Sequence, residues 1–140
     1  MIAVDERIQK FIAKHHVLTL ATIGGDSMPW VANCFYAYDR KRNILIFTTD
    51  NDTRHGREMT NNSHVAISIV LETRIVGRVQ GAQIEGIAER GDSEATRSYI
   101  KRFPYAAAAP LSIWIVRPTH IKLTDNTLGF GKKLIWQSEE

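Results

Sequence analysis

Apolar residues near the start of the chain recur at helical spacing. Val4, Ile8, Phe11 and Ile12 lie at i, i+4, i+7 and i+8, which places all four on one face of an α-helix. The helix is predicted to end near His15, where this pattern stops. A helix with one apolar face is expected to bury that face against a neighbouring layer.

The rest of the chain contains apolar and β-branched runs separated by turn-forming residues. Six runs are predicted as β-strands, at residues 17–23, 29–39, 44–49, 64–72, 78–91 and 112–118. GGDS follows the first run and DRKRN follows the second, so the first three strands are predicted to form an antiparallel meander. The segment THIKLTDN is expected to continue the last strand in a new direction after Pro118.

Two further helices are predicted between these strands. One covers residues 53–59, although Gly56 lowers its helical propensity, and the other ends at about Phe103. The candidate N-cap residues are Asp52 or Thr53 for the first helix and Asp92 or Ser93 for the second. Many strands with short connections and few helices predict a mainly β fold, an antiparallel barrel with attached helices.

The composition is that of a single globular domain. The chain has 140 residues, 44% of them hydrophobic and 24% charged, and we expect residues 1–140 to form one domain with its own core. The net charge of +3 favours anionic small ligands. The basic residues are scattered along the chain, so they do not predict a nucleic-acid-binding face.

The chain has one cysteine, Cys34, so no internal disulfide can form, which fits a reducing compartment. The first ten residues carry acidic groups and lack the apolar stretch of a signal peptide. No apolar run approaches the roughly 20 residues that a membrane-spanning helix needs. We therefore expect a cytoplasmic protein that does not associate with membranes.

The segment TTDNDTRHGREMTNN, residues 48–62, concentrates polar groups between two predicted strands. In one interpretation it is a solvated loop and helical turn whose arginines lie in water. In the other it binds an anion, because a helix N-terminus presents unpaired N–H groups and arginine contacts phosphate oxygens in pairs. The hydroxyls of Thr48, Thr49 and Thr53 would add donors, whereas the two aspartates of the DND run would repel an anion.

The remaining candidate groups are less specific. The five histidines have no spacing typical of a zinc site, so no metal site is predicted. Cys34 lies in an apolar strand, where a buried inert thiol is favoured over a reactive nucleophile. Asn33 either bonds across a bulge or faces a polar ligand, since a buried amide needs partners. GFGKK at residues 129–133 is either a solvated basic turn or a segment that closes over an anionic ligand.

Taken together, these segments resemble the flavin-binding split barrels of the pyridoxamine 5'-phosphate oxidase-like superfamily, and within it most closely the YhbP-like (UPF0306) family. The resemblance covers nearly the whole chain. It rests on KHHV, WVANCFY, FTTDNDTRH, QIEGIAER, RFP and LTDNTLGFGKKLIW, of which the last is the longest and most specific. It implies an antiparallel six-stranded split β-barrel with N-terminal and crossover helices.

The resemblance also implies a homodimer that binds FMN at its subunit interface. In this superfamily a Ser/Thr-basic-basic triplet after the third strand holds the flavin phosphate, and it matches Thr53, Arg54 and His55 here. The end of the third strand approaches the cofactor, the second strand passes the edge of the flavin ring, and a late basic residue completes the site. The matching residues are Thr48 and Thr49, then Asn33, Phe35 and Tyr36, and finally Lys132.

Departures from the superfamily pattern bear on the expected function. The oxidases have a lysine where this chain has His55, which is largely uncharged near neutral pH and therefore holds a phosphate less strongly. The basic C-terminal segment with which those oxidases hold pyridoxamine phosphate has no clear counterpart, so oxidation of that substrate is not expected. We expect an FMN-binding protein that acts as a small flavin-dependent oxidoreductase.

Two alternatives stay open on the sequence. One is a flavin- or haem-binding carrier or sensor without turnover of its own, and the other is a barrel that binds nucleic acid or general anions. No residue of the chain qualifies as an evident general acid or base, so the pattern does not name a substrate.

Overall fold

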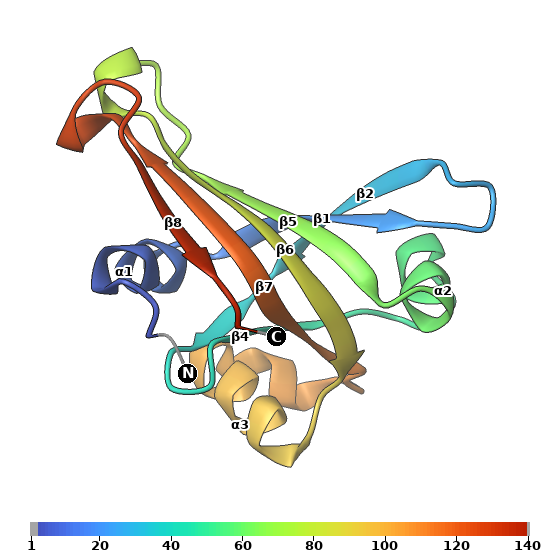
Figure 1. The fold of residues 1–140 in the computed structure, drawn as a ribbon. Coiled ribbons are helices and arrows are strands. Elements are labelled where there is room, and N and C mark those ends of the chain that lie inside the picture. Colours follow the sequence, from blue (N-terminus) through green and yellow to red (C-terminus); the bar gives the residue numbers. More distant parts are fainter. Residues whose placement is uncertain (1–2, 140) are drawn as a thin grey trace.

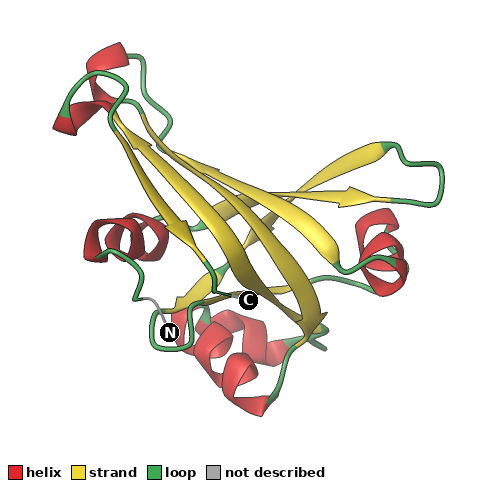
Figure 2. Cartoon of the chain, in the orientation of Figure 1, coloured by secondary structure: helices red, strands yellow, loops and turns green. Residues whose placement is uncertain are grey.

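The computed structural model describes residues 3–139, which form one antiparallel sheet curled on itself with three α-helices at its margins (Figure 1, Figure 2). The helices are α1 (Glu6–Lys14), α2 (Arg54–Asn61) and α3 (Ser93–Arg102). The strands are β1 (Val17–Ile23), β2 (Pro29–Phe35), β3 (Ala37–Asp39), β4 (Ile44–Thr48), β5 (His64–Val70), β6 (Gln80–Arg90), β7 (Ile113–Asp125) and β8 (Lys133–Gln137). Short 3-10 turns are η1 (Val76–Arg78), η2 (Pro104–Ala108) and η3 (Asn126–Leu128).

The strand order is β2-β1-β5-β6-β7-β4-β3, and β8 pairs with β7. The first part of β7 pairs with β4 and its last part pairs with β8 on the same edge. The two strands at the ends of this order, β2 and β3, follow each other in the chain and are separated by Tyr36 alone. The predicted mainly β split barrel is therefore confirmed.

The predicted number of strands is corrected by the structure: the sheet has eight strands, whereas the sequence pattern predicted six. Residues 29–39 form two strands since β2 pairs with β1 whereas β3 pairs with β4. Both antiparallel pairings of the predicted meander are present, because residues 29–39 pair with β1 through β2 and with β4 through β3. The meander does not continue beyond β4, whose other partner is β7. The second additional strand is β8, which pairs with the end of β7.

Tyr36 fixes the break between β2 and β3. Its side chain is fully buried, and its hydroxyl donates to the carbonyl oxygen of Ile12 in α1 at 2.6 Å. Its backbone N–H donates to the carbonyl of His16 at 2.9 Å, and its own carbonyl accepts from the Arg102 guanidinium at 3.1 Å. The same guanidinium donates to the carbonyl of His15 at 2.7 Å. These hydrogen bonds join β1, α1 and α3 at the point where residues 29–39 change their pairing partner from β1 to β4.

β7 continues through Pro118 as one strand, and the predicted change of direction takes the form of a shift in register. The shift falls between Glu85 and Gly86 of β6, and leaves Thr119 as an extra residue on β7. Proline has no N–H to donate, so a bulge beside it removes few hydrogen bonds between β6 and β7. Gly86 suits this place because an added Cβ would lie 2.6 Å from the Cγ1 atom of Val116.

Alternating apolar residues of the strands fill the barrel. In β5, Val65 and Ile67 are buried between exposed neighbours, as a half-buried strand requires. α1 covers one end of this core with Ile8, Phe11 and Ile12, the face predicted from their spacing. A second, smaller cluster of apolar residues lies between α3 and the β3–β4 pair.

The three helices begin at side-chain caps, which explains their boundaries. The caps Asp5, Thr53 and Asp92 accept bonds from the N–H groups of Arg7, Gly56 and Ala95, respectively. For α2 and α3 these caps are among the predicted alternatives. No helix between residues 3 and 139 is both long and apolar enough to cross a membrane.

Replacing Tyr36 by phenylalanine should lower the free energy of unfolding by about 1–3 kcal/mol, because it leaves the carbonyl of Ile12 without its buried donor. Urea denaturation of the two proteins without ligand measures the difference. Tyr105→Phe is the matched control, since Tyr105 is 71% exposed, and it should change stability by less than about 0.5 kcal/mol. Equal effects of the two substitutions would contradict the role of Tyr36.

Candidate functional site

A cavity of about 590 Å³ lies between β2, the end of β4, the start of α2 and the segment that follows α3. We call it the candidate cavity. It is lined by Asn33, Cys34 and Phe35 of β2, by Thr48, Thr49, Asp50, Thr53 and His55 around the end of β4 and the start of α2, and by Tyr99, Tyr105, Ala106, Ala109, Pro110 and Leu111 on the opposite side.

Six of the nine residues that the resemblance assigns to a flavin site line this one cavity. They are Asn33, Phe35, Thr48, Thr49, Thr53 and His55. The other three lie elsewhere. Tyr36 points into the barrel core, Arg54 turns to the other side of α2, and Lys132 lies in the turn before β8.

The polar end of the candidate cavity is a tight turn that precedes α2. The Thr53 hydroxyl donates to the carbonyl of Asp50 at 2.8 Å and accepts from the N–H of Gly56 at 3.1 Å. A Cβ atom added to Gly56 would lie 2.5 Å from that same carbonyl oxygen. Gly56 is therefore required by the close approach of the turn, which outweighs its poor helical propensity.

Thr48 ties this turn to Ser112, which follows the lining residue Leu111. Its hydroxyl donates to the carbonyl of Ser112 at 3.2 Å and accepts from the N–H of Ser112 at 3.1 Å. The N–H of Thr49 donates to the same carbonyl at 3.0 Å. Both bonding directions of the Thr48 hydroxyl are thus used within the protein, so this side chain shapes the cavity wall.

His55 is the one imidazole of the cavity lining, and it is half-buried. Its Nε2 atom and the hydroxyl of Thr49 form a hydrogen bond, which orients the ring. Burial lowers the pKa of His55 below its usual value of 6.5, against the smaller opposing influence of the Glu58 carboxylate. His55 is therefore neutral near pH 7, and it becomes a cation only as the pH falls below that range.

The opposite end of the candidate cavity is aromatic. Phe103 packs against Phe35, Tyr99 and Tyr105, with ring centroids 5.7, 5.1 and 6.3 Å apart, respectively. The segment 105–111, which supplies much of this wall, was not predicted as part of the site. Its signal in the sequence is the cluster of three aromatic residues at positions 99–105, which helical spacing alone assigns to packing.

Arg54 lies beside a second cavity, of about 430 Å³, on the other side of α2. Its Nε atom donates to the Glu58 carboxylate at 3.1 Å, and its guanidinium lies 4.2 Å from the ring centroid of Trp30. Glu58 also accepts from the buried hydroxyl of Thr22 at 2.7 Å. Hydrogen bonding by Thr22, followed by that of Arg54, lowers the pKa of Glu58, so the carboxylate is charged near neutral pH.

Lys132 belongs to a projection at the end of the sheet that is remote from α2 (Figure 1). We define the tip as residues 74–79 and 126–133. Asn126 holds its two halves together, since its N–H donates to the carbonyl of Val79 and its side-chain amide donates to that of Val76, both at 2.9 Å. The exposed residues of the tip include four basic and four apolar side chains: Arg74, Arg78, Lys132, Lys133, Ile75, Val76, Leu128 and Phe130.

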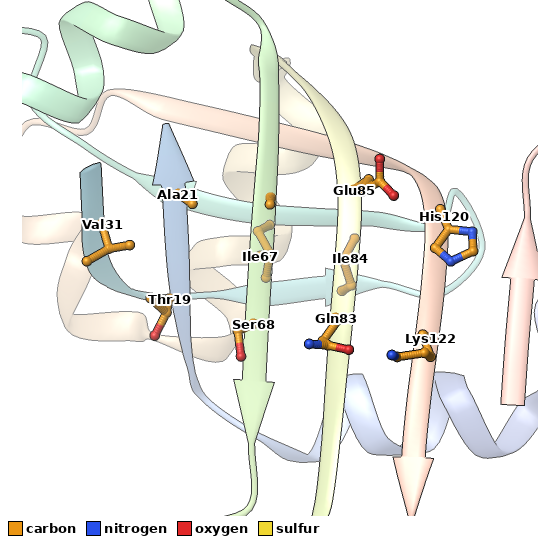
Figure 3. Close-up of a pocket in the computed structure, with 11 residues that line it drawn as sticks. Thr19, Ala21, Val31, Ile67, Ser68, Gln83, Ile84, Glu85, His120 and Lys122 are labelled. Carbon is orange, nitrogen blue, oxygen red and sulfur yellow. The ribbon is translucent and has the colours of Figure 1, made fainter. Parts of the chain in front are cut away.

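A groove of about 420 Å³ crosses the outer face of the sheet. Figure 3 shows Thr19, Ser68, Gln83 and Lys122 in a row across β1, β5, β6 and β7, and these residues are direct neighbours in the strand register. Asn33 extends the row onto β2, where its side-chain oxygen accepts from the Thr19 hydroxyl at 2.9 Å. Asn33 is exposed rather than buried, and it lines the candidate cavity while its side chain contacts Thr19 of this groove.

Cys34 also lines the candidate cavity, but it does not act as a nucleophile there. Its side chain is 8% exposed, and burial raises the pKa of the thiol to about 11. The thiol is therefore protonated at neutral pH and unreactive, as the sequence predicted.

Comparison with known proteins identifies the family to which this chain belongs. A family model described as pyridoxamine 5'-phosphate oxidase matches residues 4–125. A UPF0306 protein of Photorhabdus laumondii is 41% identical over 134 residues, which cover 93% of each chain. A UPF0306 protein of Cronobacter sakazakii is 40% identical over 139 residues, which cover 96% of each chain.

Solved structures share the fold at low sequence identity. A heme-binding protein from Mycobacterium smegmatis superposes with a TM-score of 0.80 at 18% identity, over 98% of this chain but only 60% of its own length. A FAD-binding protein from Mesorhizobium loti superposes with a TM-score of 0.69 at 13% identity, over 84% of this chain and 90% of its own. Sequence and fold together show that the chain belongs to the pyridoxamine 5'-phosphate oxidase-like family of split barrels and, within it, to the UPF0306 proteins.

Proposed function

We propose that this protein binds FMN in the candidate cavity and acts as a small FMN-dependent oxidoreductase. The observation that carries the proposal is the meeting of Asn33, Phe35, Thr49, Thr53 and His55 around one cavity. The similarity in fold to a FAD-binding protein supports a flavin as the class of ligand. A bound flavin would supply the hydride or electron transfer, and the chain would bind its phosphate and orient its ring.

The polar end of the cavity has donors that suit a phosphate. The N–H groups in the first turn of α2 have no acceptor within the helix, and the partial positive charge of the helix terminus favours an anion. The hydroxyl of Thr49, which is paired with the His55 ring, lies beside them. The Thr53 hydroxyl shapes the turn, because it donates to the carbonyl of Asp50 and accepts from the N–H of Gly56. We assign this end to the phosphate and the aromatic end, with Asn33 and Phe35, to the ring.

The cavity has no lysine or arginine among its lining residues in the described part of the chain. A phosphate monoester carries a charge near −2, and Asp50 adds a carboxylate to the lining, so further positive charge is needed. Arg54, which precedes the lining residue His55, would supply it by exchanging Glu58 for the phosphate. We propose that Arg54 makes this exchange when FMN binds.

The second proposed cation is Lys132 of the tip, which does not line the candidate cavity and belongs to a projection remote from α2 (Figure 1). A homodimer with its two sites at the interface would resolve this, with Lys132 of the partner subunit completing each site. Three apolar side chains of β2 support a covered interface here, because Trp30, Val31 and Phe35 are 44, 59 and 54% exposed. The same lack of cations argues against pyridoxamine phosphate as a substrate, since its own phosphate would need a second basic site.

A haem-binding carrier is the second candidate. It is favoured by the aromatic end of the cavity and by the similarity in fold to a heme-binding protein. Titrating the purified protein with FMN and with haem in parallel separates the two. Quenching of flavin fluorescence at micromolar protein supports the flavin proposal, whereas a shifted Soret band without flavin quenching overturns it.

Arg54→Ala should weaken FMN binding by about 1.5–3 kcal/mol, the usual loss for a hydrogen bond to a charged group. The measurement is the same fluorescence titration. Arg117→Ala is the control, because Arg117 is an exposed arginine that pairs with Glu89 at 2.6 Å and does not line the cavity. Unchanged affinity in Arg54→Ala would remove Arg54 from the phosphate site.

The affinity for FMN should depend on pH through His55. As the pH falls below 6.5, His55 gains a proton and with it an attraction for the phosphate, so binding should take up protons. The phosphate itself titrates near pH 6, so the informative quantity is the affinity of the wild-type protein relative to His55→Gln at each pH. This ratio should rise between about pH 8 and pH 5.5. A constant ratio would show that His55 does not contact the phosphate.

Hybrid dimers test whether the cation from the tip is supplied by the other subunit. Arg54→Ala and Lys132→Ala homodimers should each bind FMN weakly. In a hybrid of the two variants, one site carries both defects and the other carries neither. Half of the sites should therefore regain wild-type affinity. If Lys132 acts within its own subunit, every site of the hybrid carries one defect and no high-affinity binding returns.

A further inference from the structure

The side chain of Arg90, the last residue of β6, forms a hydrogen bond with the turn before α2 but does not line the candidate cavity. Its Nη2 atom donates to the side-chain oxygen of Asn51 at 2.6 Å, and its Nη1 atom donates to the hydroxyl of Ser112 at 2.9 Å. The Cζ atom of the guanidinium lies over the ring of Trp114, 4.2 Å from the ring centroid. Both terminal nitrogens of Arg90 are thus hydrogen-bonded while the guanidinium contacts an aromatic ring.

The two partners of Arg90 lead directly into the polar end of the cavity. The Ser112 hydroxyl donates to the side-chain oxygen of Asn51 at 3.3 Å, which closes a triangle with the guanidinium. The backbone of Ser112 is bonded to Thr48 and Thr49, as described above. Asn51 lies within the tight turn whose carbonyl at Asp50 contacts the Thr53 hydroxyl.

Arg90 itself does not line the candidate cavity. Its influence on a ligand would pass through Asn51 and Ser112, which fix the two ends of the turn relative to β7. A guanidinium suits this task because its donors are held in a rigid plane, whereas a lysine carries one rotatable ammonium. Other bonds hold the two ends of the turn, from the N–H of Thr49 to the carbonyl of Ser112 and from Arg57 to the carbonyl of Asp52. Arg90 adds the bridge that holds the side chain of Asn51, in the middle of the turn, to β6.

We propose that Arg90 is a positioning residue, which holds residues 49–53 in the conformation that binds a phosphate-bearing ligand without contacting that ligand. The inference rests on the proposed function for the identity of the ligand, FMN. It concerns a different property, the preorganisation of the turn, which can also be measured without any ligand.

The test compares three variants by FMN titration. Arg90→Met keeps an unbranched side chain on Trp114 but removes both hydrogen bonds, and it should weaken FMN binding by about tenfold or more. Arg90→Lys should restore part of the loss, because it regains one donor and the charge. Arg117→Met, which removes an exposed arginine from the neighbouring strand, should bind within about twofold of wild type.

A double-mutant cycle tests whether Arg90 acts through Asn51. If it does, adding Asn51→Ala to Arg90→Met should cost much less affinity than Asn51→Ala costs alone. Additive losses in the cycle would overturn the proposed route. So would unchanged affinity in Arg90→Met, or a loss shared equally by Arg117→Met.

Amide hydrogen exchange of the ligand-free protein provides the independent measurement. In Arg90→Met, exchange should accelerate at the amide of Thr49, which bonds to Ser112, and at those of Thr53 and Gly56, which bond within the turn. The amides of β5 should keep their protection. Uniform acceleration across the barrel would indicate a purely structural role and overturn the proposal. If the wild-type protein fails to bind FMN, the proposed function falls, and the exchange result still decides the role of Arg90.

Discussion

The fold and the candidate cavity both depend on one constraint: a single run of the chain supplies the two ends of the sheet. β2 pairs with β1 and β3 pairs with β4, and Tyr36 stands between them with its hydroxyl bound to α1. This change of partner brings the end of β2 next to the end of β4, although β4 has no ladder with β2. The candidate cavity forms where these two strand ends meet the start of α2.

Arg102 is the second element of this closure. Its guanidinium joins the carbonyls of His15 and Tyr36, and it lies within 5.7 Å of the ring centroids of both Tyr36 and Phe103. Its partial burial lowers its pKa, although an arginine stays charged at any physiological pH. This half-buried cation, bonded to two carbonyls, connects the aromatic wall of the cavity with the barrel closure, so the site and the fold share this contact.

Periodicity and caps could be read from the sequence because they depend on near neighbours. The face of α1 and the positions of the main strands follow from local spacing, and the caps Thr53 and Asp92 were each one of two predicted alternatives. The break at Tyr36 could not be predicted. The alternation of apolar and polar residues indicates which face of the sheet a side chain occupies, but not which strand its residue pairs with. The same limit explains β8 and the pairing of β4 with β7.

The sequence predicted which segment of the chain contributes to the candidate site, but not the directions in which the side chains of that segment point. Thr53, Arg54 and His55 are consecutive, yet successive residues of a helix point about 100° apart, so His55 lines the cavity while Arg54 contacts Glu58 and Trp30. The wall at residues 105–111 and the bridge by Arg90 arise from contacts distant in sequence. Gly56 lowered the helical propensity of the segment predicted as α2. The structure shows why a glycine is needed there, since the carbonyl of Asp50 lies too close to admit a Cβ atom.

The walls of the candidate cavity come from three separate stretches of the chain, at residues 33–35, 48–55 and 99–111. These stretches meet only in the closed barrel, so the unfolded chain retains no binding site. Any ligand of the cavity must therefore stabilise the whole fold, by about 2.7 kcal/mol at a concentration one hundred times its dissociation constant. The melting temperature of the protein thus reports occupancy of the cavity by any small molecule, whatever the chemistry of that molecule.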